Sequence, residues 1–192
     1  MPGAYSNPNL AIEDSLKNLD VDYIDLMLIH QPGSNDENVY KAMENYYKEG
    51  KLKSIGISNY YTKNAVDKVL SYATIKPALI QNENHIYYQN NELKEYVKKD
   101  GIIIESWYPF GGRGHTSESF NNDIILKLAD KYKKTSAQII LRWHLQAGYI
   151  VIPGSKNPDH IKENYNVFDF ELSSEDMEKI YQINKNKRYE YW

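Results

Sequence analysis

Short, largely apolar runs rich in β-branched residues alternate along this chain with stretches of helical periodicity. This alternation restricts the fold more than any other feature of the sequence. The runs indicate buried parallel strands, and they are Tyr23–Ile29, Ser54–Ser58, Ala78–Gln81, Ile102–Trp107 and Tyr149–Ile152. Strands that alternate with helices form right-handed crossover units around a parallel sheet. The sequence therefore predicts an α/β fold.

The stretches between these runs predict helices, and capping signals mark some of their ends. Asn7-Pro8 fits an N-cap followed by a first-turn proline, and it opens a helix that continues through Leu19. The apolar face of this helix is expected to carry Leu10, Ile12, Leu16 and Leu19. Further helices are expected at Asp36–Lys48, Thr62–Tyr72, Asn90–Lys98, Asn121–Tyr132 and Ser136–Ala147, around Glu163, and from Ser173 or Ser174 onward. Gly148 follows one of them at a typical C′ position.

The number of strands bears on whether the sheet can close. A (β/α)8 barrel has eight strands and typically about 250 residues. This chain has 192 residues and five predicted strands. Five parallel strands do not easily close a barrel, so open edges would need cover or pairing. We therefore expect a single α/β domain, residues 1–192, with an open sheet of about five parallel strands and surrounding helices.

Composition excludes several classes of protein and site. The formal net charge of −3 offers no basic field for nucleic acid or an anionic membrane. The chain has no cysteine, which excludes a disulfide scaffold, thiolate metal ligands and thiol nucleophiles. Its apolar runs are far shorter than the ~20 residues of a membrane helix, and no leader precedes Leu10. We expect a cytoplasmic protein that binds neither nucleic acid nor membrane.

Hydrogen-bonding or aromatic side chains follow the carboxyl end of every predicted strand. Ligands of α/β proteins bind at that edge of the sheet, so these side chains together predict a ligand site. The positions are His30, Ser58-Asn59, Gln81, Trp107 with the loop 109–114, and Ser155.

Other polar residues in or near the strands have simpler interpretations. Glu83 and His85 could suggest a metal pair, but no third ligand is evident, so no metal site is predicted. Glu105 lies in a strand and is expected to be paired structurally. His144 lies in a helix and is expected in the core or an interface.

Several long motifs, in consistent order, resemble one protein family. The segment Ser15–Pro32 (SLKNLDVDYIDLMLIHQP) resembles the aldo-keto reductase signature around the active-site histidine of that family. Further matches lie at Gly50–Tyr60, Lys76–His85, Asp100–Gly114, Val151–Asn164 and Val167–Met177. The resemblance implies part of a (β/α)8 barrel that reduces an aldehyde or ketone with NADPH.

The resemblance assigns roles at the nicotinamide end of the cofactor by position. His30 matches the histidine that orients the substrate, which makes it the catalytic candidate of this chain. Ser58, Asn59 and Gln81 match the groups that hydrogen-bond the nicotinamide carboxamide. Trp107 stands where an aromatic residue stacks on the nicotinamide ring, a role that needs only a flat π-face.

The resemblance also places the phosphates and the adenosine. The backbone of one loop would cradle the pyrophosphate, and its residues include Pro109, Phe110, Gly111 and Arg113. The adenosine end would be held by Ser155, His160, Glu163 and Asn164. Many members carry an arginine at position 160 and a lysine at position 154, where this chain has His160 and Gly154. Imidazole lacks the fixed charge and bidentate fork of arginine, so NADP(H) is expected and NAD(H) is left open.

The catalytic tyrosine, lysine and aspartate of the family lie in its first three βα units. The five strands predicted here match strands four to eight, so the resemblance implies an N-terminally truncated domain without those residues. Tyr5 echoes the catalytic turn, but no strand precedes it and Asn7-Pro8 serves as a helix start. We therefore expect weak or no reduction of a small carbonyl substrate by the isolated chain.

Two alternatives remain open at this stage. The chain could be a catalytically dead pseudoenzyme that serves as a dinucleotide-binding or protein-interaction module. It could also form a homo-oligomer or swapped assembly that covers the open sheet edges.

Overall fold

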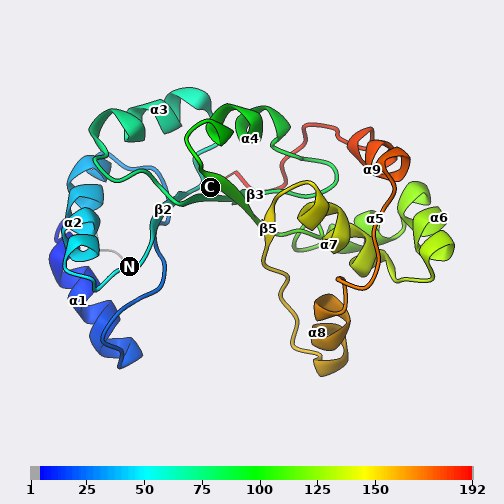
Figure 1. Ribbon diagram of the computed structural model, residues 1–192, viewed down its shortest axis with the longest axis horizontal. Helices are drawn as coiled ribbons and strands as arrows, with labels where there is room; N and C mark the ends of the chain where they lie inside the picture. The colour runs from blue at the N-terminus through cyan, green and yellow to red at the C-terminus, as the bar shows by residue number, and fades with distance from the viewer. Residues whose placement is uncertain (1–4, 192) are drawn as a thin grey trace. The chain divides into compact units, whose positions relative to one another are not determined.

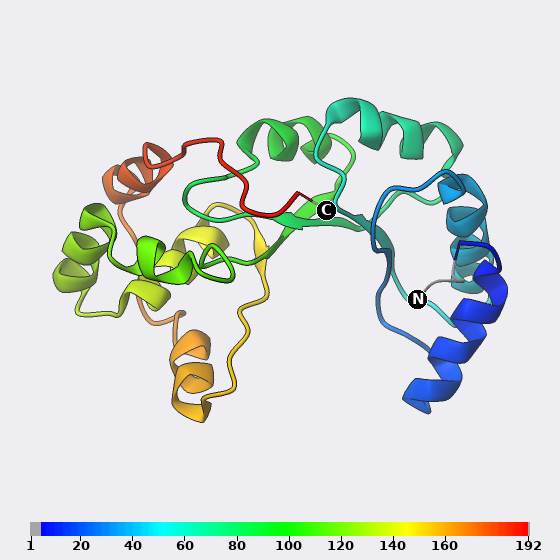
Figure 2. The same cartoon turned by 180° about the vertical axis from the view of Figure 1, so that it is seen from behind.

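The computed structural model describes residues 5–191, which contain nine helices and five strands. These residues divide into two compact units. Of these residues, unit 1 comprises 5–82 and Glu92–Ile103, and unit 2 comprises Glu83–Asn91 and 104–191. Figures 1 and 2 trace the elements of each unit in chain order from opposite sides.

Unit 1 is built on three parallel strands with helices between them. Its elements are α1 (Pro8–Leu19), β1 (Met27–Ile29), α2 (Asp36–Lys48), β2 (Ile55–Ser58), α3 (Lys63–Tyr72), β3 (Leu79–Glu83) and α4 (Asn91–Lys98), with the last residue of β3 and the first of α4 in unit 2. β2 pairs with β1 and β3, and Leu28 lies opposite Gly56. A Cβ at Gly56 would lie 2.7 Å from both the Leu28 side chain and the Leu79 carbonyl oxygen. Glycine therefore allows the three strands to pack closely at this point.

The core of unit 1 lies between these strands and the helices. Its fully buried side chains include Tyr40, Met43, Leu52, Ile55, Ile57, Val66 and Ile80. From α1, Ile12 and Leu16 are buried, whereas Leu10 and Leu19 are 55% and 60% exposed. The prediction of one apolar face is therefore wrong for Leu10, whereas Leu19 lies on the same side as Ile12 and is exposed as the last residue of α1. At about 100° per residue, Leu10 lies on the opposite side of the helix from Ile12.

The described residues of unit 2 form two parallel strands, which pair with each other, and five helices. Its elements are β4 (Ile103–Trp107, with its first residue in unit 1), α5 (Thr116–Phe120), α6 (Asp123–Tyr132), α7 (Ser136–Gln146), β5 (Ile150–Val151), α8 (Pro158–Tyr165) and α9 (Ser174–Tyr181). Glu105 of β4 lies opposite Ile150 of β5. A capping box between Thr135 and Gln138 starts α7, which packs against α6 and α8. The core includes Ile104, Ile125, Ile139, Ile140, Trp143 and Ile180.

The structure confirms the five predicted strands and most of the predicted helices. β1 is shorter than its prediction, because residues 23–26 form no strand apart from an isolated bridge between Ile24 and Leu52. Gly148 follows α7 with φ +82°, as its C′ position requires. α5 was not predicted, since its five residues carry too few apolar positions to show helical periodicity.

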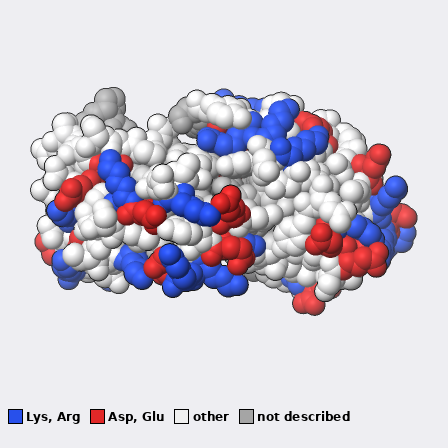
Figure 3. Space-filling view, turned by 90° about the horizontal axis from the view of Figure 1, so that it is seen from above, with Lys and Arg blue, Asp and Glu red and all other residues white. Residues whose placement is uncertain are grey.

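Positively and negatively charged side chains are intermixed on the face drawn in Figure 3. Exposed ion pairs such as Lys51–Glu13, at 3.0 Å, contribute little to stability. Asp176 in unit 2 differs, because its carboxylate is buried and accepts hydrogen bonds from Lys131 and Tyr132, both at 2.6 Å. Burial alone would raise the pKa of Asp176, but these bonds outweigh burial and hold the pKa below its ordinary value.

In the described part of the chain, no helix has the length and apolar character needed to cross a membrane.

Candidate functional site

The predicted nicotinamide-end residues of unit 1 lie together at the carboxyl ends of β1, β2 and β3. The Asn59 side-chain amide donates to the His30 backbone carbonyl at 2.8 Å and to Ser58 Oγ at 3.2 Å. Ser58 Oγ donates to the Gln81 backbone carbonyl at 2.9 Å. Ser58 also lies directly opposite Gln81 in the β2–β3 register. These bonds tie three neighbouring strand ends into one polar cluster.

Asn59 can turn back toward β1 because of its backbone conformation. Its φ is +68°, in the left-handed region that asparagine tolerates better than most residues. Its backbone N–H donates to the Gln81 carbonyl at 3.0 Å. Ser58 is 1% exposed, whereas His30 is exposed at the end of β1. The cluster therefore has a fixed interior and presents the imidazole to solvent.

The loop after β1 is fixed by a second set of contacts. Buried Asp36 accepts hydrogen bonds from the Gly33 N–H at 2.8 Å and from the Tyr60 hydroxyl at 2.7 Å. The Tyr5 hydroxyl donates to the Gln31 carbonyl, and burial raises the pKa of this phenol. Tyr5 thus anchors the segment that carries His30.

In unit 2, Trp107 opens a loop with an unusual backbone. φ is positive at Tyr108 (+55°), Gly111 (+91°), Gly112 (+73°) and Gly114 (+81°). A Cβ at Gly112 would lie 2.2 Å from the Tyr108 ring, so the ring can fold over the loop only where glycine stands. Left-handed residues of this kind form concave backbone nests whose N–H groups bind anions. A backbone of this geometry suits the phosphate role that the family resemblance implied for the loop.

Aromatic contacts hold the flanks of this loop. The half-buried Trp107 ring meets the Tyr108 ring edge to face, with centroids 4.6 Å apart. Phe110 meets Phe120 of α5 in the same way at 5.1 Å. Pro109 and Gly111 are buried, whereas Arg113 is exposed.

The predicted adenosine-end residues of unit 2 lie between β5 and the end of α8. Ser155 Oγ accepts the backbone N–H of Asn157, the N-cap of α8, at 3.1 Å. His160 is exposed on α8. The Glu163 carboxylate accepts a hydrogen bond from the Thr135 hydroxyl, a contact that joins α8 to the start of α7. A pocket of about 310 Å³ lies beside this segment, and its lining includes Leu141, Val151, Ile161, Asn164 and Tyr165.

The buried polar pair of unit 2 has a role that the sequence did not reveal. His85 Nε2 lies 3.0 Å from Glu83 Oε1, and both side chains are fully buried. Glu83 also accepts the backbone N–H groups of Tyr189 and Glu190, at 2.6 and 3.0 Å. Because these partners lie more than 100 positions further along the chain, no local sequence pattern predicts the two hydrogen bonds. Among the described residues, no group of three or more metal-ligating side chains could hold a metal ion.

His144 is a core residue, as predicted. Its ring lies between two backbone carbonyls, with Nδ1 2.8 Å from Ile140 O and Nε2 3.2 Å from Asn84 O. Burial lowers the pKa of this imidazole to about 4, so it is neutral at pH 7.

Comparison with known proteins places these features in a family. The sequence profile of the Aldo/keto reductase family matches residues 4–185. The chain is 40% identical over 185 residues to a glyoxal reductase of Bacillus subtilis, covering 96% of this chain and 65% of the relative. The chain belongs to the aldo/keto reductase family. It spans about two thirds of the length of the curated relatives it matches.

Other members of the aldo/keto reductase family share sequence and fold with this chain. A methylglyoxal reductase of Yersinia pestis is 37% identical over 187 residues, covering 95% of this chain and 66% of the relative. The solved structure of an aldo-keto reductase from a deep-sea metagenome has a TM-score of 0.93 and 38% identity, and the match covers 97% of this chain and 69% of that one. A Bombyx mori aldo-keto reductase solved in complex with NADP has a TM-score of 0.87 and 30% identity, with 96% and 65% covered. The predicted fold, an incomplete barrel-like α/β structure, is confirmed.

Proposed function

We propose that this chain binds a reduced nicotinamide dinucleotide and reduces small aldehydes or ketones with it, slowly when it acts alone. The observation that carries the proposal is the cluster of His30, Ser58, Asn59 and Gln81 at three neighbouring strand ends. Family membership supports the same activity, because related proteins are glyoxal and methylglyoxal reductases. Small dicarbonyl compounds are therefore the substrates to test first.

The described residues fit the cofactor on structural grounds. Four residues of the loop 108–114 have positive φ, and a Cβ at Gly112 would clash with the Tyr108 ring. A loop backbone of this kind suits the binding of a diphosphate through its N–H groups. The half-buried Trp107 offers an aromatic surface at the start of this loop. The half-buried Gln81 carries a side-chain amide of the kind that suits a carboxamide, while Ser58 and Asn59 use their hydrogen bonds to hold the strand ends around it. When bound, a reduced nicotinamide supplies the hydride for the carbonyl carbon.

His30 is the residue we expect to act on the substrate. Its imidazole is exposed at the strand end, and its backbone is held by Asn59, so it could donate a hydrogen bond to a carbonyl oxygen. The Tyr5 phenol is engaged with the Gln31 carbonyl, and burial raises its pKa, which disfavours ionisation. Water would then supply the proton to the reduced oxygen. A positioned general acid contributes about 10²–10⁴-fold, so turnover without one should be slow.

The deciding experiment is a titration of the chain with NADPH, and separately with NADH, followed by tryptophan fluorescence and by calorimetry. We expect saturable quenching from Trp107. Trp107→Phe should keep most of the calorimetric affinity and lose the quenching, because a flat ring remains while the fluorophore is gone. Trp143 is fully buried and serves as an internal reference for folding. Absence of binding to either dinucleotide would overturn the proposal.

A second measurement separates an enzyme from a binding module. We expect NADPH to be consumed faster with glyoxal or methylglyoxal than without a substrate. If the chain binds NADPH but neither compound raises the rate of NADPH consumption, a pseudoenzyme is favoured instead.

A further inference from the structure

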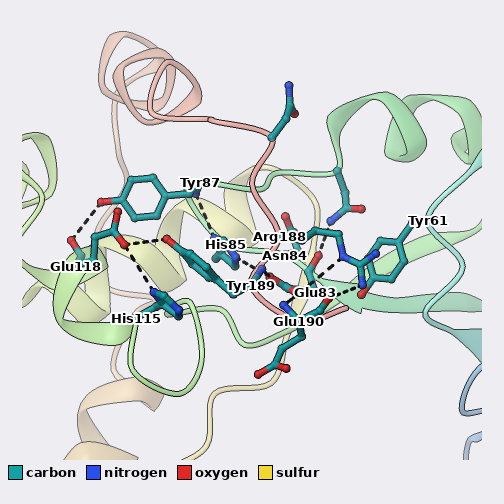
Figure 4. A network of polar contacts seen from close by, with 12 residues as sticks. Tyr61, Glu83, Asn84, His85, Tyr87, His115, Glu118, Arg188, Tyr189 and Glu190 are labelled. Atoms are coloured by element: carbon teal, nitrogen blue, oxygen red, sulfur yellow. Dashed lines mark hydrogen bonds and ion pairs between the residues drawn. The ribbon is translucent and has the colours of Figure 1, made fainter. Parts of the chain in front are cut away.

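The segment that contains Tyr189 and Glu190 is anchored to a buried carboxylate. Glu83 accepts the Tyr189 and Glu190 backbone N–H groups at 2.6 and 3.0 Å, and His85 Nε2 lies 3.0 Å from it (Figure 4). Burial alone would raise the pKa of Glu83, but the hydrogen bonds from His85 and the two N–H groups hold the pKa below its ordinary value. The anchor is therefore a charged acceptor, which makes its hydrogen bonds strong.

The anchored segment places the Tyr189 ring between two histidines. The ring stacks on His85 with centroids 4.8 Å apart and an interplanar angle of 14°, and on His115 with 3.6 Å and 3°. Its hydroxyl donates to Glu118 Oε2 at 2.9 Å, and His115 Nδ1 lies 3.7 Å from the same oxygen. Figure 4 shows the Tyr189 ring between the two imidazoles and its hydroxyl directed at Glu118. His85 is fully buried, so one side of this stack belongs to the core.

The other side of the stack belongs to the glycine-rich loop. The His115 N–H donates to the Gly112 carbonyl at 3.3 Å, and the Thr116 hydroxyl donates to the same carbonyl at 3.1 Å. A Cβ at Gly111 would lie 3.3 Å from His115 Cβ, so the two residues are packed closely. The position of His115 thus fixes the end of the left-handed loop. Three glycines between positions 111 and 114 would otherwise leave this loop with much conformational freedom.

We propose that Tyr189 is a positioning residue that clamps the loop Gly111–His115 in its phosphate-binding shape. The proposal rests on the function proposed above. Ordering a glycine-rich loop costs conformational entropy, and a loop that is already ordered binds its ligand more tightly. The clamp would therefore raise affinity for the pyrophosphate part of a dinucleotide and leave affinity for its adenosine part unchanged.

The first test follows the loop without any ligand. We expect Tyr189→Ala to speed hydrogen exchange of the Gly111 and His115 amides about tenfold. The reason is that the loop opens more easily once two aromatic stacking contacts are lost. Amides of α6 and α7 should exchange at the wild-type rate. Tyr191→Ala is the matched control, because Tyr191 is 78% exposed and should leave loop exchange unchanged. Unchanged loop exchange in Tyr189→Ala would overturn the clamp whatever the chain binds.

The second test uses two ligands that differ in the pyrophosphate. For Tyr189→Ala we expect the Kd for NADPH to rise about tenfold, again from the loss of two stacking contacts. The Kd for adenosine 2′-phosphate, which has no pyrophosphate, should stay the same. Tyr189→Phe keeps both ring stacks, so its Kd for NADPH should lie between those of the wild type and Tyr189→Ala. A variant that weakens both ligands equally, or neither, would refute the proposal.

The two tests fail in different ways. If wild-type protein does not bind NADPH, the proposed function is wrong, and the exchange measurement still decides whether Tyr189 holds the loop. If wild-type protein binds NADPH and Tyr189→Ala binds it equally well, only the positioning role is wrong.

Discussion

The side-chain amide of Asn59 donates a hydrogen bond to the backbone carbonyl of His30 at 2.8 Å, across 29 positions of sequence. This bond joins the end of β2 to the end of β1 and fixes the backbone of the residue that we expect to meet the substrate. It depends on a left-handed asparagine, with φ +68°. Backbone conformation and candidate chemistry are thus linked at one position.

Substitutions at Asn59 should separate the effect of its backbone from that of its amide. Asn59→Gly keeps the left-handed backbone and loses the amide, so we expect a loss of about 1 kcal/mol in the free energy of unfolding. Asn59→Ala loses the amide and also strains the backbone, which should cost about 1 kcal/mol more. Urea denaturation measures both values. Equal stability of the two variants would show that the left-handed conformation does not matter here.

Two glycines of the loop after β4 offer a matched pair. A Cβ at Gly112 would meet the Tyr108 ring at 2.2 Å, whereas a Cβ at Gly114 would meet nothing within 4 Å, and φ is positive at both. Gly114→Ala should therefore cost only the backbone strain, about 1 kcal/mol. Gly112→Ala should cost about 1–3 kcal/mol more, because the ring or the loop must move. It should also weaken NADPH binding more than Gly114→Ala does. Thermal denaturation compares the stability of the two variants, and calorimetry compares their NADPH affinity. A larger loss in Gly114→Ala than in Gly112→Ala would contradict the packing of the Tyr108 ring against Gly112.

Replacement of His30 should affect turnover more than cofactor binding. His30→Gln keeps a hydrogen-bond donor on the side chain but loses the imidazole and its geometry. We expect kcat to fall about 10²-fold, at the low end of the range for loss of one well-placed hydrogen-bond donor to the developing oxyanion. The Kd for NADPH should remain within about twofold, since the Asn59 amide binds the backbone carbonyl of His30, which the substitution leaves in place. A rise in Kd with unchanged kcat would assign His30 to the cofactor instead.

The choice between the two dinucleotides should depend on position 160. His160 is exposed on α8, and an imidazole lacks the charged, bidentate fork through which arginine would bind a 2′-phosphate. We expect His160→Arg to raise the preference for NADPH over NADH about tenfold, as one charge-assisted contact would. His160→Gln is the uncharged control and should leave the ratio unchanged. The gain should shrink at high salt, because an exposed contact is screened.

Local pattern predicted the strands, most helices and the polar strand ends, because each depends on residues close in sequence. The cluster of His30 and Asn59 could be anticipated only because the motif carried both residues. The bonds from Tyr189 and Glu190 to Glu83 could not, since they join segments more than 100 residues apart. The exposure of Leu10 is a different case, because a rotation of about 100° per residue already places Leu10 and Ile12 on opposite sides of the helix.

His144 should make the protein less stable in mild acid. The pKa of its imidazole is about 4 in the folded chain, against an ordinary value of 6.5, because burial disfavours the charged form. Between these values the unfolded chain binds more protons, so acidification from pH 7 to pH 4 favours unfolding. The stabilising contribution is complete above pH 6.5, and about 3 kcal/mol of it is lost by pH 4.

The variant His144→Gln isolates this contribution from that of the carboxylates. Its amide does not titrate and carries N–H donors for a neighbouring carbonyl such as that of Ile140. The free energy of unfolding of the wild type should fall more steeply than that of the variant between pH 6.5 and pH 4. Parallel curves would mean that His144 is protonated in the folded state, and that the two carbonyls, each close to one ring nitrogen, stabilise a buried imidazolium.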